Sequence, residues 1–382
     1  MRQSIRTISM LLFLLSTSVL VLLNSAKQKR IFILHSYNTD YAWTQQVNAG
    51  IRKAIAENAN IASNYDVRYY YMNAKNIPFE TAEDAQDPTI LAKKSIDLYQ
   101  PDILIAFDDI AQQYVVAPYY LNKPDMRIVF SGVNGDINNY CMTDERKPGQ
   151  CYNDAQNVQG TLERIPVASV VEVIRLLKGR NKSLHGNHTR VHFLQDASAT
   201  AKQDAEYLAS VERKPDWKEV EFSRSPIIET FSEWQEYVAA ITKDNADFLL
   251  VDGYRKLKLE KPEDTIDGMR LYADPADVAD WTERNASVPI IGLNGFSSED
   301  GFMLSVGVSP YELGRRAYRQ AAQPESDDGA NTTTEKIGVS HQYLVAVNAC
   351  SLARRGVTLP NILEVFARTT DQYYTRAKGC QH

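Results

Sequence analysis

Short apolar runs alternate along the chain with longer stretches in which apolar residues recur every three or four positions. The apolar runs predict buried strands, and in the first part of the chain the predicted strands lie at 30–34, 67–72, 101–107 and 127–130. The periodic stretches predict helices at 43–58, at 89–99 and from Ala111 onward. Strands that alternate with helices are typical of a mainly parallel sheet covered by helices. The first part of the chain therefore predicts one α/β lobe.

A second series of the same kind follows an extended segment at 157–161. Its predicted helices lie at 167–177, 199–211 and 230–242, and its predicted strands lie at 190–194, 247–251 and 288–291. The chain has 382 residues, which exceeds the usual size of a single domain. We therefore expect an α/β fold of two Rossmann-like lobes with parallel sheets.

The last third of the chain contributes to both predicted lobes. An apolar run at 301–306 and a helix from Pro310 are expected to return to the first lobe, whereas 336–345 and the helix after it close the second. We expect the first lobe to comprise 27–157 and about 301–325, and the second to comprise 158–300 and about 334–382. The polar stretch 323–334 predicts a surface loop between them in sequence.

The amino terminus has the pattern of a signal peptide. Arg2 and Arg6 precede an apolar run of 14 residues at 10–23, and small residues follow up to Ala26. The run is shorter than the about 20 residues that a membrane-spanning helix needs. We expect cleavage of residues 1–26 and export to the periplasm, so that the mature protein is not embedded in a membrane. An uncleaved anchor is the alternative, because Asn24 is an unusual residue at its position before the cleavage site.

The composition is that of a folded globular protein, with 44% hydrophobic and 24% charged residues. The net charge is −6, and removal of the signal peptide with its two arginines changes it to −8. An acidic protein is poorly suited to bind a polyanion, so we expect neither nucleic acid nor an anionic membrane surface as a partner. The expected partner is a small molecule.

The chain contains four cysteines, and an even number in an exported protein predicts disulfides. Three pairings are possible, and we favour Cys141–Cys151, which closes a short polar loop, and Cys350–Cys380, which ties down the C-terminal tail. Closing a loop of this size contributes about 3 kcal/mol in the chain-entropy model. Free thiols are the alternative. A metal site is disfavoured because the cysteines form no C-x-x-C pair and have no suitably spaced histidine.

The candidate ligand-binding residues are those that follow the predicted strands, because ligands of open parallel sheets lie outside the carboxyl ends of the strands. They are polar or aromatic, as a small polar ligand with an apolar part requires. In the first lobe they are Ser36, Tyr37, Trp43, Asp108, Asp109, Asn134 and Gly135. Just beyond the predicted hinge they are Thr161 and Glu163, and in the second lobe Asp196, Asp252, Tyr254 and Asn294.

Several of these residues have a structural alternative. Asp108 and Asp109 are suited to bind an ammonium or hydroxyl group, but acidic residues also cap helix starts. Ser36 is suited to hold a ligand carboxylate at a helix N-terminus or to act as an ordinary N-cap. Trp43 can stack on a ligand ring or pack in the core of its lobe. Glu163 can contact a ligand or pair with a neighbouring arginine.

Several segments carry a specific resemblance, and they occur in a fixed order. They are Ile33-Leu34-His35-Ser36-Tyr37 with Trp43 after it, Asp108-Asp109-Ile110-Ala111-Gln112, 129–135 and 157–164. Together they resemble the ABC-transporter substrate-binding-protein-like family with the type 1 periplasmic binding fold. The resemblance implies two lobes, joined by crossover strands, that close on a small molecule, and an aromatic or other small amino acid is the ligand it suggests. The chain departs from the pattern by inserting the loop 141–151.

The resemblance and the strand-end residues together favour a binding protein without chemistry of its own. We expect it to deliver its ligand to an ABC permease; the alternative is a ligand-sensing subunit of a membrane signalling protein. A hydrolase that uses the carboxylates of Asp108 and Asp109 is a rival interpretation. His35 has no Ser-centred, metalloprotease or phosphate-loop motif beside it, so it is expected to be structural or to contact the ligand. We expect no cofactor and no metal.

Overall fold

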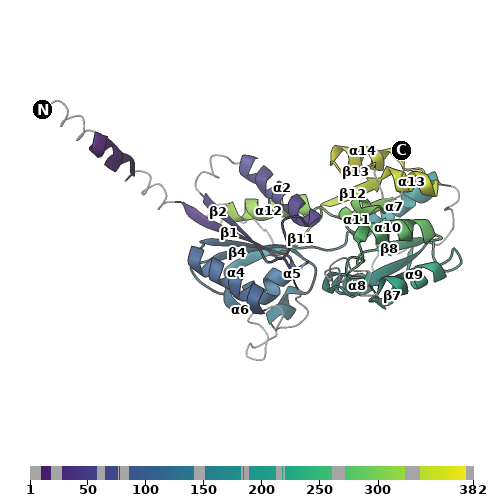
Figure 1. The fold of residues 1–382 in the computed structure, drawn as a ribbon, viewed down its shortest axis with the longest axis horizontal. Helices are drawn as coiled ribbons and strands as arrows, with labels where there is room; N and C mark the ends of the chain where they lie inside the picture. Colours follow the sequence, from purple (N-terminus) through teal and green to yellow (C-terminus); the bar gives the residue numbers. More distant parts are fainter. Residues whose placement is uncertain are drawn as a thin grey trace. The chain divides into compact units, whose positions relative to one another are not determined.

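The computed structural model describes residues 10–18, 28–57, 65–75, 77, 86–141, 151–181, 184, 189–211, 217, 220–259, 272–322 and 336–375. The chain divides into two compact units (Figure 1). Lobe 1 comprises Met1–Thr161 and Tyr311–Gly338, and lobe 2 comprises Leu162–Pro310 and Val339–His382. Within the described residues, no helix is both long enough and apolar enough to span a membrane.

The sheet of lobe 1 has six strands in the order β11-β5-β4-β3-β1-β2. They are β1 (Lys29–His35), β2 (Tyr65–Tyr71), β3 (Ile103–Phe107), β4 (Arg127–Val133), β5 (Val158–Leu162) and β11 (Ile337–Val339). β1 pairs in parallel with β2 and β3, and β3 pairs in parallel with β4. His35 lies opposite both Tyr71 and Phe107, and Phe107 lies opposite Ser131. The carboxyl ends of these four strands therefore meet at one edge.

Helices cover both faces of this sheet, because its central strands are apolar on both sides. β3 is buried along its whole length. In Figure 1, α2 and α12 lie on one face and α4 and α6 lie on the other. The helical elements of lobe 1 are α2 (Ala42–Glu57), α4 (Gln86–Tyr99), α5 (Asp108–Ala111), η1 (Gln112–Val116), α6 (Ala117–Tyr119), η2 (Ile137–Cys141) and α12 (Pro310–Ala322).

The sheet of lobe 2 has seven strands in the order β13-β12-β10-β9-β8-β6-β7. They are β6 (Thr189–Asp196), β7 (Val220–Ile228), β8 (Phe248–Val251), β9 (Ile290–Gly292), β10 (Leu304–Val308), β12 (Tyr343–Asn348) and β13 (Tyr373–Tyr374). β12 runs antiparallel to β10, and the other pairs are parallel. The helices are α7 (Val167–Arg180), α8 (Ala199–Val211), α9 (Phe231–Ala240), α10 (Pro275–Asn285), α11 (Phe296–Asp300), α13 (Ala349–Arg355) and α14 (Asn361–Thr369).

The boundary expected from the sequence differs from the observed one at three strands. β10 was expected in the first lobe but lies in lobe 2, where Leu304 is opposite both Ile291 and Val347. β5 and β11 were expected in the second lobe but belong to the sheet of lobe 1, where Gly160 N donates to Lys336 O at 2.9 Å. Short apolar runs of similar length predict a strand, but they contain no information on which of two sheets the strand joins.

Two glycines let α2 and α12 pack with their backbones in contact. A Cβ on Gly50 would lie 1.8 Å from Tyr311 O, and one on Gly314 would lie 2.1 Å from Val47 O. An ion pair supports the same contact, because Arg315 binds Glu57 with Nη2 3.0 Å from Oε1. The returning helix α12 is thereby held firmly against the first helix of lobe 1.

Some sequence predictions concern residues outside the described ranges. Of the predicted signal peptide, residues 10–18 form a helix with exposed apolar side chains, whereas the predicted cleavage site lies outside the described residues. The predicted surface loop at 323–334, the segment 142–150 and Cys380 also lie outside them.

Candidate functional site

Ser36, the first residue after β1, bonds within the protein. Its hydroxyl donates to Phe107 O at 2.7 Å and accepts from Ala111 N at 2.9 Å. The side chain therefore ties the end of β1 to the end of β3 and to α5. Its hydroxyl proton is already used, so the side chain has the role of a structural cap rather than that of a free donor for a ligand carboxylate.

His35 is fully buried at the carboxyl end of β1. Its ring stacks on Tyr71 and on Phe107, with centroids 5.0 Å apart in each case. Nε2 lies 3.0 Å from Asn48 Oδ1. Burial lowers the pKa of His35 from 6.5 to about 3, so the ring is neutral at physiological pH. The residue acts as a packing element of the strand end.

An aromatic group follows His35 at the start of α2. The ring of Tyr37 makes edge contacts with Tyr41 at 5.1 Å and with Trp43 at 6.0 Å between centroids. Trp43 also makes an edge contact with Phe107 and is only 5% exposed. The structure therefore places Trp43 in the core of lobe 1, and Tyr37, which is also 5% exposed, packs beside it.

Asp108 begins α5 with an unusual backbone. Its φ is 73°, a value that residues other than glycine rarely adopt and that tends to persist at functional sites. The carboxylate is buried and accepts hydrogen bonds from Asp109 N at 2.7 Å and from the Tyr37 hydroxyl. Burial, followed by the nearby charge of Asp109, raises the pKa of Asp108 to about 7. This carboxyl group can therefore change protonation near neutral pH.

Asp109 has a different role, because three donors of the same segment converge on it. Its carboxylate accepts from Asn134 N at 3.2 Å, from Gly135 N at 2.9 Å and from the Tyr140 hydroxyl. These bonds fix the turn after β4 against the turn after β3. Asn134 and Gly135 are thus brought to the candidate site by their backbones, and Asp109 is the residue that positions them.

Lys75 belongs to the same strand edge and was missed by sequence reasoning. It lies in the turn after β2, and its Nζ is 4.2 Å from the ring centroid of Tyr37 and 5.0 Å from that of Tyr41. Its charge also acts to lower the pKa of Asp108. The rule that selects residues after each strand would have found Lys75, had it been applied to the second strand as well.

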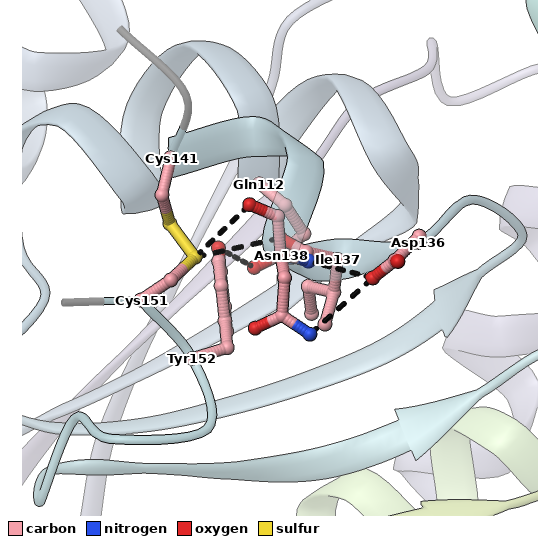
Figure 2. Close-up of a disulfide and its surroundings, with 7 residues drawn as sticks. All are labelled: Gln112, Asp136, Ile137, Asn138, Cys141, Cys151 and Tyr152. Atoms are coloured by element: carbon pink, nitrogen blue, oxygen red, sulfur yellow. Dashed lines mark hydrogen bonds between the residues drawn. A yellow bond between two sulfur atoms is a disulfide. The ribbon is translucent and has the colours of Figure 1, made fainter. Parts of the chain in front are cut away.

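A disulfide borders this part of the site (Figure 2). Cys141 and Cys151 are bonded with Cα atoms 5.7 Å apart, which confirms the predicted pairing. Tyr140 precedes one cysteine and reaches Asp109. Tyr152 follows the other and donates to Gln112 Oε1 at 3.0 Å, as Figure 2 shows. Each cysteine of the disulfide is therefore next to a tyrosine whose hydroxyl donates a hydrogen bond to the segment after β3.

The surroundings of the disulfide are equally ordered. Cys151 Sγ lies 3.4 Å from Asn138 O, a contact without a hydrogen bond because a disulfide sulfur has no proton to donate. Asn138 N in turn donates to Asp136 Oδ1 at 3.0 Å, which closes a small turn (Figure 2). Cys350 is also disulfide-bonded, and its expected partner, Cys380, lies outside the described residues.

In lobe 2, the strand ends bring two of the predicted residues together. Asn294 Nδ2, after β9, donates to Asp252 Oδ1, after β8, at 2.7 Å. Asp196, the last residue of β6, is fully buried and accepts from Ser198 N at 3.0 Å and from Lys256 N at 2.8 Å. Asp252 and Asn294 therefore form a polar pair at the edge, whereas Asp196 shapes the turns around it.

Tyr254 is a core residue of lobe 2. It is fully buried, its hydroxyl donates to Asp300, and its ring makes an edge contact with Phe302. Arg255 forms an ion pair with the same carboxylate and lies 4.5 Å from the ring centroid of Phe296. Burial raises the pKa of Asp300, and the Arg255 charge opposes this shift. Sequence reasoning missed both members of the ion pair.

Thr161 and Glu163 lie where the chain first passes from lobe 1 to lobe 2. Both are buried, and Thr161 Oγ1 has no hydrogen-bond partner within the described part of the chain. The Arg164 guanidinium donates to the backbone carbonyl of Glu163 at 2.6 Å. The described contact therefore involves the main chain of Glu163.

Two open hollows lie at the other edge of the lobe 1 sheet. They have volumes of about 600 and about 680 Å³, and both are lined by Asp102 and Lys123. Lys29, at the start of β1, and Arg127, at the start of β4, line the first. Because they lie at the amino ends of the strands, they are separate from the strand-end residues described above.

Solved structures with a similar fold cover almost the whole chain. An open, ligand-free substrate-binding protein with adhesive properties from Clostridium difficile has a TM-score of 0.59 and 16% identity, covering 92% of this chain and 100% of its own. A structure from Streptococcus pneumoniae, described as an ABC domain in complex with L-Trp, has a TM-score of 0.54 and 15% identity, covering 88% and 98%. A conserved domain protein from Vibrio cholerae has a TM-score of 0.54 and 16% identity, covering 89% of this chain and 98% of its own.

No protein-family model matches the chain, and no curated protein matches its sequence. Identities of 15 and 16% relate these proteins by fold. The order of parallel strands and helices in each lobe, and the match over most of the chain, agree with the resemblance stated from the sequence. The chain has the type 1 periplasmic binding protein fold, with two α/β lobes built on largely parallel sheets.

Proposed function

We propose that this chain is an exported solute-binding protein that captures a small molecule and delivers it to an ABC permease. The observation that carries the proposal is the gathering of aromatic rings, a carboxylate and an ammonium at the carboxyl ends of the lobe 1 strands. These residues are Tyr37, Tyr41, Lys75 and Asp108. Open parallel α/β sheets bind their ligands outside the carboxyl ends of the strands, which is the edge where these residues lie.

We propose an amino acid as the ligand, and an aromatic one in the first place. A buried carboxylate such as that of Asp108 is suited to an ammonium group, and aromatic rings beside it are suited to an apolar side chain. In lobe 2, the amide of Asn294 and the carboxylate of Asp252 form a polar pair at the strand ends of that lobe's own sheet. The complex of the Streptococcus pneumoniae structure with L-Trp supports the same ligand class.

Thermal unfolding of the mature, oxidised protein tests the proposal. The panel consists of amino acids, sugars, nucleosides and polyamines, and hits are confirmed by calorimetry. We expect an aromatic amino acid to stabilise the protein selectively, because a ligand at 100 times its Kd adds about 2.7 kcal/mol to the free energy of unfolding.

The variant Asp108→Asn should bind the same ligand at least tenfold more weakly. Lys123→Met, at the opposite edge of the same sheet, is the matched control and should bind like the wild type. Stabilisation by a sugar alone would contradict the amino-acid ligand while leaving solute binding in place. No stabilisation by any compound of the panel would contradict the proposed function itself.

A further inference from the structure

The ammonium group of Lys75 already occupies a site that is built for a cation. The faces of Tyr37 and Tyr41 lie 4.2 and 5.0 Å from Nζ, measured to the ring centroids. The carboxylate of Asp108 is near enough for the Lys75 charge to act on its pKa. We call Tyr37, Tyr41 and Asp108 the tyrosine–aspartate cage. Two aromatic faces and a carboxylate around one position form a site typical of organic cations.

The backbone places Lys75 at the cage through specific contacts. Met72 N donates to His35 O, and Ala74 N donates to Ser36 O, each at 2.9 Å. These bonds extend the pairing of β2 beyond its last residue, so Lys75 begins a turn directly beside Tyr37. Asn73, with φ at 62°, allows the chain to turn there. The position of Lys75 is therefore a consequence of the fold and not of a long, free side chain alone.

The charged groups in and beside the cage differ in how they are held. Asp109, which is not part of the cage, accepts hydrogen bonds from two backbone amides and a tyrosine hydroxyl, so its carboxylate already has partners within the protein. Lys75 is only half-buried, and its four-carbon stem can rotate toward solvent. Asp108, in contrast, is 5% exposed and retains a need for a positive partner when it is ionised.

We propose that Lys75 is the resident cation of the tyrosine–aspartate cage and that the ammonium group of a ligand replaces it on binding. This inference rests on the proposed solute-binding function and deepens it. The ligand class it selects is that of primary amines and other compact organic cations. Ligand binding then exchanges one ammonium for another over the two tyrosine rings, within the electrostatic reach of Asp108.

The experiment removes the Lys75 ammonium from the cage by mutation and measures whether a small ammonium compound binds in its place. Lys75→Ala removes three carbons and the ammonium, and n-propylammonium supplies the same atoms; n-propanol is the neutral probe of the same size. We expect n-propylammonium to bind Lys75→Ala at least tenfold more tightly than it binds the wild type, as measured by calorimetry. Lys75→Ala/Asp108→Asn should lose this gain, and n-propanol should show none.

A matched control is available in the same lobe. Lys123 Nζ also lies over one aromatic face, 4.6 Å from the ring centroid of Tyr120. Because Lys123 is an exposed residue with one ring, Lys123→Ala should bind n-propylammonium no better than the wild type does. Lys75→Ser, which is equally short, is the second variant should Lys75→Ala fail to fold.

The outcomes separate this inference from the proposed function. Equal binding of n-propylammonium to the wild type and to a folded Lys75 variant would overturn the inference, even if an amino acid binds the wild type. Tight, Asp108-dependent binding of the probe would support the cage even if no compound of the ligand panel stabilises the wild type, a result that contradicts the proposed function alone.

Discussion

Two buried ionisable residues meet at the carboxyl end of the lobe 1 strands with opposite pKa shifts. His35 and Phe107 are partners in the sheet, and Asp108 follows Phe107 directly. Burial disfavours the charged form of each, so it lowers the pKa of His35 to about 3 and raises that of Asp108 to about 7. The two residues should therefore give the stability of the protein opposite dependences on pH.

For Asp108, the folded state holds a proton between pH 4 and pH 7 that the unfolded state has released. Its contribution to stability is present below about pH 4 and is lost as the pH rises through about 7. We predict that Asp108→Asn removes this loss, so its advantage over the wild type in free energy of unfolding grows from pH 4.5 to pH 7.5. Urea unfolding at both pH values measures it. A constant difference would show that Asp108 titrates normally.

For His35, the unfolded state binds a proton below pH 6.5, whereas the folded state binds it only when the pH falls to about 3. Its contribution is complete above pH 6.5 and is lost as the pH falls toward 3. We predict that His35→Phe, which keeps a ring between Tyr71 and Phe107, loses less stability than the wild type between pH 7 and pH 4. Thermal unfolding across this range checks the prediction, and parallel curves would contradict it.

At the scale of the elements, burial explains which strands the sequence reveals. β3 is a continuous apolar run that is buried throughout; the predicted strand, 101–107, ends at the same residue and begins two residues earlier. β7 has no prediction at all, because it is an edge strand in which exposed, charged residues such as Glu221 and Arg224 interrupt the apolar pattern. Buried strands can be predicted from the sequence as apolar runs. Edge strands such as β7 lack this pattern and are recognised only by their pairing in the sheet.

The crossing of α2 and α12 gives a prediction at this scale. Gly50→Ala places a methyl group against Tyr311 O, and overpacking of this kind costs about 1–3 kcal/mol. Gly179→Ala, in α7, is the matched control, because its added Cβ meets nothing within 4 Å and alanine is the better helix former. Chemical unfolding should show Gly50→Ala destabilised and Gly179→Ala unchanged or more stable. Equal effects would mean that the helices are not in backbone contact.

At the scale of the whole molecule, the sequence predicts the two lobes and the strand edge at which the candidate site is sought. It does not predict which strand-end residues face a ligand, since Ser36 and Trp43 have the same spacing whether they bind, cap or pack. Arg255 was missed for a related reason. Its importance depends on the carboxylate of Asp300 and the ring of Phe296, which helix α11 brings to it.

The return of α12 and β11 to lobe 1 also has a consequence for the order of folding. Glu57 and Arg315 are 258 residues apart in the chain, yet they join the first and last helices of one lobe. Closing so long a loop is slow, and the missing partner is synthesised only after most of lobe 2. Lobe 1 therefore stays incomplete while the chain emerges, which would keep an exported protein in the unfolded form that can still be threaded through a membrane.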